Sequence, residues 1–397
     1  MNIIKLSFKN MLNRPLSTIL SLILLTLGVG MISLLLKINH QVQDQMNNNL
    51  RGIDMVVGAK GSPLQLILSA VYHIDAPTGN IHLNEARKLG KNRLVEATIP
   101  LAYGDSYEGY KIVGTEHEYP KLYDGILENG RLWNGPFEVT VGAKVAQALN
   151  LKLGDSFSGS HGLAEGGESH DEHQYKVVGI LEPSNAVIDQ LILTAIESVW
   201  ETHHHEDKEH EKEHEDDKEI TAMLVKFRSP MGLVQLPRIV NEKTNMQAAI
   251  PSYEIGRLFN LMGVGIETLS GIAVAIMIVS GLSIFISLFS ALKEREYEMA
   301  LMRAYGSTRW QLLWLVLQEG LLLGLLGFFL GLSFSRVGLW LINKLVESNY
   351  YYSLTGSVWL KEEWWLFIVT IAIGLFASLI PAIRAFTINI SKTLADA

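Results

Sequence analysis

The sequence predicts a membrane protein with four transmembrane α-helices and an α+β domain inserted between the first and second helices. Three observations lead to this fold class. The 397-residue chain combines a mean hydropathy of +0.19 with 19% charged residues, a mixture typical of membrane segments joined to a sizeable soluble domain. Four long runs are almost free of charge. A long region with short β-like patterns separates the first run from the other three.

Each apolar run reaches the ~20 residues that a helix needs to cross a bilayer. Glu319 is the one charged residue in Trp310–Ser335, and the other runs carry none: Pro15–Leu36, Thr268–Leu292 and Trp364–Ile383. The first run is longer than the apolar part of a cleavable signal peptide, and no small-x-small site follows it, so we expect an anchor. We assign the spans to residues 16–37, 264–292, 310–342 and 364–386.

Lysine and arginine indicate which ends of the runs face the cytoplasm, because cytoplasmic loops carry an excess of both. They precede the first run, separate the second from the third and follow the fourth: Lys5, Lys9, Arg14, Lys293, Arg295, Arg303, Arg309, Arg384 and Lys392. We therefore expect residues 1–15, 293–309 and 387–397 in the cytoplasm and residues 38–262 and 343–363 outside it. Tyrosines and tryptophans around the second exported loop suit the membrane surface.

The exported region is predicted to be an α+β domain on two stalks, Lys37–Leu50 and Tyr253–Met262. Between the stalks, strand patterns and helix patterns alternate. The strands are Asp54–Val57, Tyr110–Gly114, Glu138–Val141, Lys176–Leu181 and Ala222–Phe227, and the helices are Asn84–Leu89, Ala143–Leu151 and Met231–Met246. The chain has no cysteine, so this domain of about 225 residues relies on its core for stability.

Gly58–Pro63 contains glycine, lysine and serine but lacks the spacing of a phosphate-binding loop. We interpret it as a structural turn that leads into a helix at Leu64–Ala70 against the stalk. No phosphate-binding motif of this kind occurs elsewhere, so the chain has no ATPase motif of its own.

The segment between the second and third spans, residues 293–309, is predicted to be a short amphipathic helix. Tyr297, Leu301 and Ala304 recur at three- and four-residue spacing, and glutamates and arginines occupy other faces. Gly306 then ends the helix. A charged helix held between two spans is well placed to be pushed by a soluble partner.

The same segment resembles the cytoplasmic signature of FtsX/MacB-type ABC transporter permeases, roughly E-R-x-x-E-I-x-x-x-R-A-x-G. The matching residues are Glu294, Arg295, Glu298, Met299, Arg303, Ala304 and Gly306, with methionine where isoleucine is usual. Leu153–Phe157 and Tyr175–Leu181 resemble a β-hairpin of the family, and Pro381–Ala385 resembles its closing P-A-x-R-A string. The tail after residue 387 lacks the proline and the leucine-arginine pair that the family usually adds.

The resemblance implies a permease subunit of an ABC transporter in the bacterial inner membrane, with cytoplasmic termini and a large periplasmic domain. A separate cytoplasmic ATPase would bind and hydrolyse ATP, so the chain itself is expected to be no enzyme, with no catalytic residue. The expected partners also include a second permease copy, membrane lipids and a periplasmic adaptor, lipoprotein or metal-binding protein, but no nucleic acid.

Three functions remain open at this point, and the third, collection of zinc or another divalent ion and its transfer to or from partners, is compatible with the first. In a transporter of the MacB or LolC/LolE type, ATP-driven motion would export or extract a substrate. In a regulator of the FtsX type, the same motion would activate a periplasmic partner such as a cell-wall hydrolase. The large exported domain favours the transporter, because FtsX-type exported domains are small.

Glu319 is a functional candidate by default, because a carboxylate within an apolar span is costly. We expect it to pair with Arg303 or with a neighbouring helix. Gly320, Gly324, Gly327 and Gly331 follow it as a stripe of small residues for close helix packing, within the chain or across a dimer. Arg336 is expected to reach the outer headgroups.

Two inserts, residues 161–173 and 203–219, are rich in histidine and acid and are predicted to be flexible. They hold eight of the twelve histidines: His161, His170, His173, His203, His204, His205, His210 and His214. Imidazoles among carboxylates suit Zn²⁺ and other divalent transition metals. Two interpretations stay open: weak, exchangeable metal capture, and solvated acidic loops with incidental histidines.

Overall fold

The computed structural model describes residues 15–161, 169–203, 218–350 and 359–388, together with residues 7, 9–11 and 13. The chain divides into two compact units. A helical unit contains residues 1–42 and 262–397, and an α/β unit contains residues 43–261.

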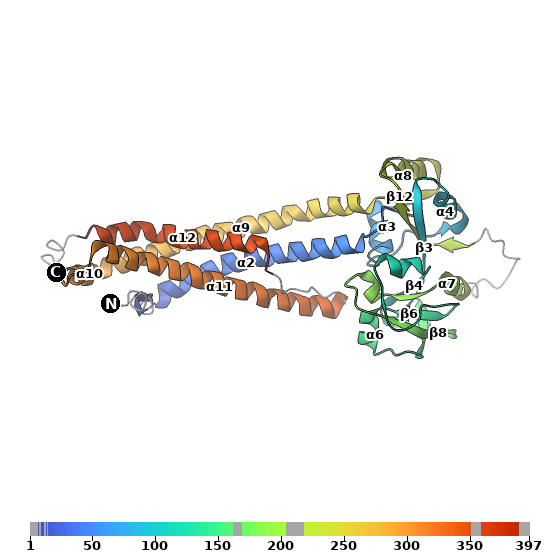
Figure 1. Cartoon of the computed structure of the whole chain (residues 1–397), viewed down its shortest axis with the longest axis horizontal. Coiled ribbons are helices and arrows are strands. Elements are labelled where there is room, and N and C mark those ends of the chain that lie inside the picture. Colours follow the sequence, from blue (N-terminus) through green and yellow to red (C-terminus); the bar gives the residue numbers. More distant parts are fainter. Residues whose placement is uncertain are drawn as a thin grey trace. The chain divides into compact units, whose positions relative to one another are not determined.

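Four helices of the described chain are long and apolar enough to cross a membrane, which confirms the predicted number. They are α2 (Pro15–Asn49), α9 (Pro251–Glu294), α11 (Arg309–Tyr350) and α12 (Lys361–Phe386), and they run side by side (Figure 1). Helix α9 begins at Pro251, so the predicted return stalk and the predicted second span form one continuous helix. Helix α2 likewise continues past the predicted span to Asn49.

The core of the helical unit takes apolar side chains from all four long helices. It includes Leu25, Val29, Met277, Ile284, Leu323, Phe328, Leu366 and Ala377. Apolar residues also face outward, and Val264 and Phe376 are 66% and 73% exposed. Helices that are apolar on all sides fit a lipid surrounding, in which every backbone group is bonded within the helix.

The predicted glycine stripe packs closely within the chain. A Cβ atom on Gly320 would lie 2.5 Å from the carbonyl oxygen of Gly374 in α12, and one on Gly331 would lie 2.7 Å from the Cβ of Val29 in α2. Real Cβ atoms essentially never lie this close to another heavy atom. Helix α11 can therefore approach α12 and α2 this closely only because glycine has no side chain at these positions.

Helices α2 and α9 are joined by serines. The hydroxyl oxygens of Ser21 and Ser283 lie 2.8 Å apart, and Ser287 donates to Ser17 at 3.1 Å. In lipid such interhelical hydrogen bonds contribute to packing that apolar surfaces alone do not drive.

Arg336 has a partner that was not predicted. Its guanidinium lies between α11 and α12 and contacts Glu363 at 3.0 Å. This partner was missed because Glu363 was assigned to the exported loop, whereas α12 begins at Lys361 and brings Glu363 into the bundle.

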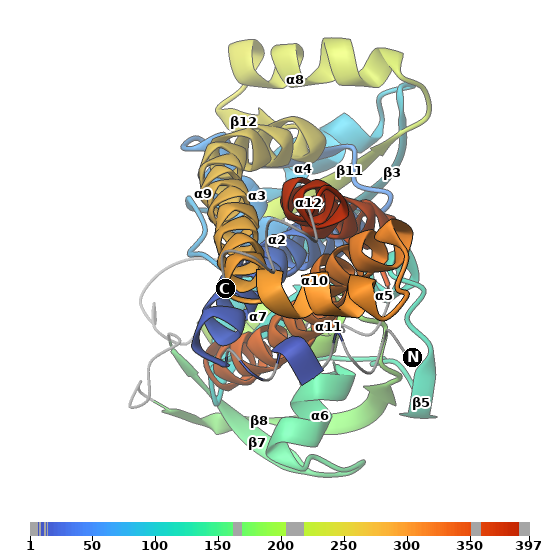
Figure 2. The same ribbon diagram turned by 90° about the vertical axis from the view of Figure 1, so that its left-hand side faces the viewer.

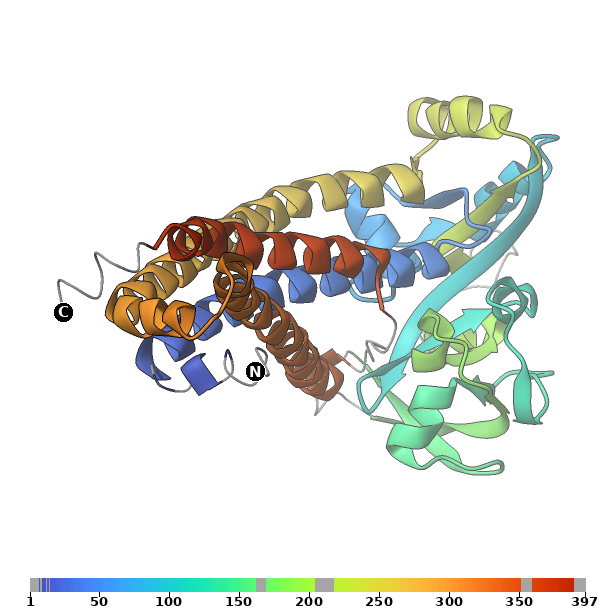
Figure 3. The same cartoon turned by 60° about the vertical axis from the view of Figure 1, so that its left-hand side comes forward.

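The α/β unit is built on one ten-stranded mixed sheet with the order β12-β1-β11-β3-β4-β9-β6-β8-β5, and β7 pairs with β3 and β8. The strands are β1 (Met55–Ala59), β3 (Val95–Tyr107), β4 (Tyr110–Thr115), β5 (Leu127–Gly130), β6 (Glu138–Val141), β7 (Ser156–His161), β8 (Ser169–Leu181), β9 (Ile192–Ala195), β11 (Ala222–Phe227) and β12 (Met246–Ala249). A second, two-stranded sheet contains β2 (Ile81–His82) and β10 (Glu219–Ile220). Long strand β3, cyan in Figure 3, pairs with β11 in its first half and with β4 and β7 in its second.

Helices cover the sheet: α3 (Pro63–Ala70), α4 (Leu83–Gly90), α5 (Glu118–Leu122), α6 (Ala143–Leu149), the 3₁₀ helix η1 (Val187–Gln190), α7 (Ile196–His203) and α8 (Met231–Lys243). Alternation along β1 sends side chains to two cores. Val56 packs in one core with Leu66 and Ile67 of α3, and Met55 and Val57 pack in another core. The second core also holds apolar residues of α4, α7 and α8.

Most predicted elements of this unit form, but α8 ends three residues earlier than predicted. Thr244 is extended, and its hydroxyl donates to the carbonyl of Val240 at 2.7 Å and accepts from Met246 N–H at 3.1 Å. This local bonding ends the helix and starts edge strand β12. Asn241 of α8 then bonds both the N–H and the carbonyl of Ala248, which covers that edge.

The two long helices that enter the α/β unit are anchored in it. The Asn49 side chain accepts from Val187 N–H at 2.9 Å, and Tyr72 donates to the carbonyl of Met46 at 3.2 Å. At the start of α9, Ile255 belongs to the core around α3, and Leu258 and Phe259 pack against it. The last turns of α2 and the first turns of α9 are therefore packed in this core.

Candidate functional site

The segment between the second and third long helices folds into α10 (Glu296–Ala304), which Figure 2 shows between α9 and α11. Arg295 breaks the helical path with φ −105° and ψ 10°, and Gly306 ends α10 with a left-handed φ of +98°. Met299 and Ala300 are buried in a core that α10 shares with α11 and α12.

The face marked by three- and four-residue spacing is the exposed face of α10. Tyr297, Leu301 and Tyr305 are 49%, 39% and 84% exposed, and Ala304 is exposed too. Glu298 is also exposed, beside the positive end of the helix dipole. The arrangement presents an aromatic and apolar patch with acidic neighbours.

The Arg295 side chain fixes the start of α10 to α11. Its guanidinium lies 3.8 Å from Glu319 and donates to the carbonyl of Asn10 at 3.1 Å. Asn10 in turn donates its amide to Glu319 at 2.9 Å. Glu319 is 7% exposed, so this pair and this hydrogen bond compensate a buried carboxylate.

Of the two predicted alternatives for Glu319, the pair with Arg303 does not form, whereas the pair with a neighbouring helix does, through Arg295 directly after α9. Arg303 donates instead to the carbonyl of Ile388 at 3.0 Å, which ties the end of α10 to the segment after α12. Arg295 takes the place beside Glu319 because the break before α10 turns its side chain toward α11. The two ends of α10 are thus held by different partners.

Of the predicted coupling residues, Arg295, Met299 and Arg303 make the contacts that hold α10. Glu294 is the last residue of α9, Glu298 and Ala304 lie on the surface, and Gly306 forms the turn. No local pattern marks Asn10 and Ile388, because both residues act through long-range contacts.

Two family models match the chain. The MacB-like periplasmic core domain matches residues 18–235, more than half of the chain, and the FtsX-like permease C-terminal domain matches residues 270–390. The chain belongs to the MacB/FtsX permease family. The second match contains α10 and the pair of Arg295 with Glu319.

One known protein is similar to this chain over much of the chain's length. An uncharacterized ABC transporter permease protein of Mycobacterium tuberculosis is 26% identical over 282 residues, which are 68% of this chain and 30% of that protein. The chain therefore spans less than a third of that relative's length.

Two solved structures are similar in part. The periplasmic region of MacB from Actinobacillus actinomycetemcomitans has 14% identity and a TM-score of 0.35, covering 54% of this chain and 98% of its own. The extracellular domain of the noncanonic ABC-type transporter YknZ from Gram-positive bacteria has 12% identity and a TM-score of 0.31, covering 49% and 98%.

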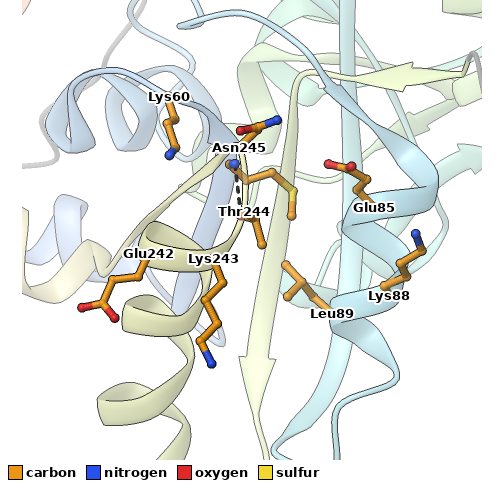
Figure 4. A pocket seen from close by; sticks show the side chains of 9 residues that line it. Lys60, Glu85, Lys88, Leu89, Glu242, Lys243, Thr244 and Asn245 are labelled. Atoms are coloured by element: carbon orange, nitrogen blue, oxygen red, sulfur yellow. Dashed lines mark hydrogen bonds between the residues drawn. The ribbon is translucent and has the colours of Figure 1, made fainter.

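The α/β unit of this permease-family chain also carries a cleft of about 520 Å³ (Figure 4). Its lining includes Lys60 after β1, Lys88 of α4 and Lys243 at the end of α8. Of its two carboxylates, Glu242 is held by Arg238 at 2.9 Å, so Glu85 remains to balance three ammonium groups. The lining of the cleft therefore carries a net positive charge.

The histidine and acid inserts lie mostly outside the described residues, which contain neither residues 162–168 nor residues 204–217. Part of the first insert is strand, since β7 reaches His161 and β8 starts at Ser169, and His203 ends α7. Among the described residues no group of three or more potential metal ligands occurs. Metal capture by the inserts stays a prediction.

Proposed function

We propose that this chain is the permease subunit of an ABC transporter in the bacterial inner membrane, and that α10 receives the push of a separate cytoplasmic ATPase. The observation that carries the proposal is that one face of α10 is packed against the helix bundle and the opposite face is exposed. Its back is fixed to the bundle through Met299, Arg295 and Arg303, while Tyr297 and Leu301 are exposed at its front.

The fixed back supports transmission of force. A push on the exposed face is passed to α11 through Arg295 and Glu319, because separating two charges in an apolar surrounding is costly. It is passed to the end of α12 through Arg303 and the carbonyl of Ile388. Since Arg295 directly follows α9, the push also acts along the helix that begins in the core of the α/β unit.

The orientation follows from charge. Lys293 and Arg309 flank α10 and Arg303 lies in its last turn, so this end of the bundle lies in the cytoplasm together with both termini, and the α/β unit lies in the periplasm. ATP binds to the partner and not to this chain, which carries no phosphate-binding loop.

A dimer of two copies fits the proposal, because each chain offers one α10 and ABC ATPases work in pairs. The substrate is exported or extracted on the periplasmic side, with lipids around the bundle and an adaptor, lipoprotein or metal-binding protein as a further partner. The size of the α/β unit, residues 43–261, favours transport over activation of a cell-wall hydrolase.

Binding of the ATPase subunit to the full chain in nanodiscs tests the proposal. Leu301→Glu adds a charge to the exposed face and is expected to weaken binding at least tenfold, about 1.4 kcal/mol. Leu301→Met keeps the apolar surface and serves as the matched control. Equal affinities of both variants would rule out α10 as the docking face.

A further inference from the structure

A second polar cluster lies at the end of the bundle away from α10. Glu363 of α12 is fully buried and accepts hydrogen bonds from three sides. Arg336 of α11 contacts both of its oxygens at 3.0 Å, Ser33 of α2 donates at 2.8 Å and the N–H of Leu360 donates at 3.2 Å. Ser33 also contacts the hydroxyl of Ser335 at 3.1 Å. One carboxylate therefore joins three helices.

The cluster is buried where a charge is costly. Ser33 and Ser335 are fully buried. Lys37 of α2 is 3% exposed and interacts electrostatically with Arg336 and Glu363. A buried ion pair adds little net stability, yet loss of one partner leaves an uncompensated charge. Such a pair is therefore hard to pull apart.

Elsewhere α2 contacts α11 through apolar and small residues. Gly327 packs on Leu25, Gly331 on Val29, and Gly30 on Phe334. Contacts of this kind have no fixed donor and acceptor, and lipid tails are as apolar as the side chains, so helices can shift along them at low cost. The cluster at Glu363 adds a charged, directional contact between α2 and helices α11 and α12, and we expect it to resist sliding of α2 along them.

We infer that Arg336, Glu363 and Ser33 are positioning residues that pass movement of α11 and α12 to α2. Helix α2 is the recipient because it continues from Ser33 to Asn49, whose side chain is bonded into the α/β unit. The inference rests on the proposed function. It adds a second route of transmission, through α2, to the route along α9.

Spin labels can follow this movement, because the chain has no cysteine to compete with introduced ones. One label replaces exposed Phe376 of α12, and the other replaces exposed Val234 of α8 in the α/β unit. The distance between them is measured by pulsed electron resonance on the full chain with its ATPase in nanodiscs, with and without ATP and vanadate. ATP hydrolysis is recorded in parallel.

Glu363→Gln is expected to lose most of the ATP-dependent shift in this distance while ATP hydrolysis continues, because α10 is unchanged. Glu362→Gln, an exposed neighbour in the same helix, is expected to keep the full shift. The double variant Arg336→Met with Glu363→Met removes both charges and so avoids an unpaired buried one. It should insert normally and still lose the shift.

A full shift in Glu363→Gln, or recovery of the shift in the double methionine variant, would overturn the inference and leave the proposed function intact. The second result would mean that the pair only neutralises charge. Absence of any ATP-dependent shift in the unsubstituted chain would instead overturn the proposed function, and with it the inference.

Discussion

The guanidinium of Arg295 lies 3.8 Å from the carboxylate of Glu319, and this pair joins the start of α10 to the first third of α11. Both side chains are largely buried, at 13% and 9% exposure. The contact connects the residue just before the exposed helix with the one acid in the third apolar run. It is the core of the coupling site that we propose.

Removal of the Glu319 carboxylate should lower the stability of the helical unit. Glu319→Ala leaves Arg295 buried without its anion, and we expect about 3–5 kcal/mol of lost stability in the helical unit. Glu319→Gln keeps an acceptor for Asn10 and should lose less. Thermal unfolding in detergent ranks the stabilities of the unsubstituted chain, Glu319→Gln and Glu319→Ala. An alanine variant as stable as the unsubstituted chain would show that the pair is not buried in the membrane.

Glu298 and Arg303 should act independently, because Glu298 is exposed and Arg303 bonds to Ile388. Glu298→Lys should reduce ATPase affinity alone, whereas Arg303→Glu should also loosen the segment after α12. A double-mutant cycle on ATPase affinity should be additive within about 0.5 kcal/mol. A larger coupling energy would indicate that the two charges form a pair.

The α/β unit should lose stability in acid because of His73. This histidine is buried, and its Nε2 bonds to the Tyr119 hydroxyl at 2.8 Å while its Nδ1 has no partner among the described residues. Burial, with a smaller effect of Lys111, lowers the pKa of His73 to about 3 from 6.5. The unfolded chain therefore takes up a proton between these values that the folded chain does not, so stability falls as pH drops below 6.5 and returns as pH rises.

The expected slope below pH 6 approaches about 1.4 kcal/mol per pH unit. Hydrogen exchange of the backbone amides of α3 in urea, recorded on the full chain at several pH values, measures this slope of stability against pH. His73→Phe should flatten the slope, whereas His82→Gln, which changes an exposed histidine, should leave it unchanged. An unchanged slope in His73→Phe would assign the acid sensitivity to other groups.

Metal capture by the inserts predicts weak zinc binding at several sites. Neutral imidazole is the ligand, so affinity should rise as pH rises through about 6.5. Replacement of the eight insert histidines by glutamine should abolish the heat of zinc binding to the full chain. Equal binding by both proteins would mean that the inserts are solvated loops.

Local patterns predicted much of the fold, and long-range contacts account for what they missed. The short β-like runs Ala222–Phe227 and Glu138–Val141 predicted β11 and β6 with the observed bounds, and both strands are buried over most of their length. Glu319 stood out because it is the one acid in its run. Its partner could not be read off, because no glycine or proline marks the break at Arg295 that turns this side chain toward α11.

The same limit applies to Arg336. Its partner Glu363 follows 27 residues later and was separated from it by a predicted loop. Periodicity reports which side of a helix is apolar, but it does not report which neighbour a charge will meet. The exposed face of α10 is a related case, since the pattern Tyr297, Leu301 and Ala304 identified a face without showing that it lies outside the core.

Site-specific crosslinking in membranes tests the central claim most directly. A photoreactive group in place of Tyr305, 84% exposed beside α10, should capture a subunit that mass spectrometry identifies as an ABC ATPase by its phosphate-binding loop. The same group in place of Phe376, 73% exposed on α12, should capture none of it. Capture from Phe376 but not from Tyr305 would contradict the account, because the ATPase would then dock away from α10.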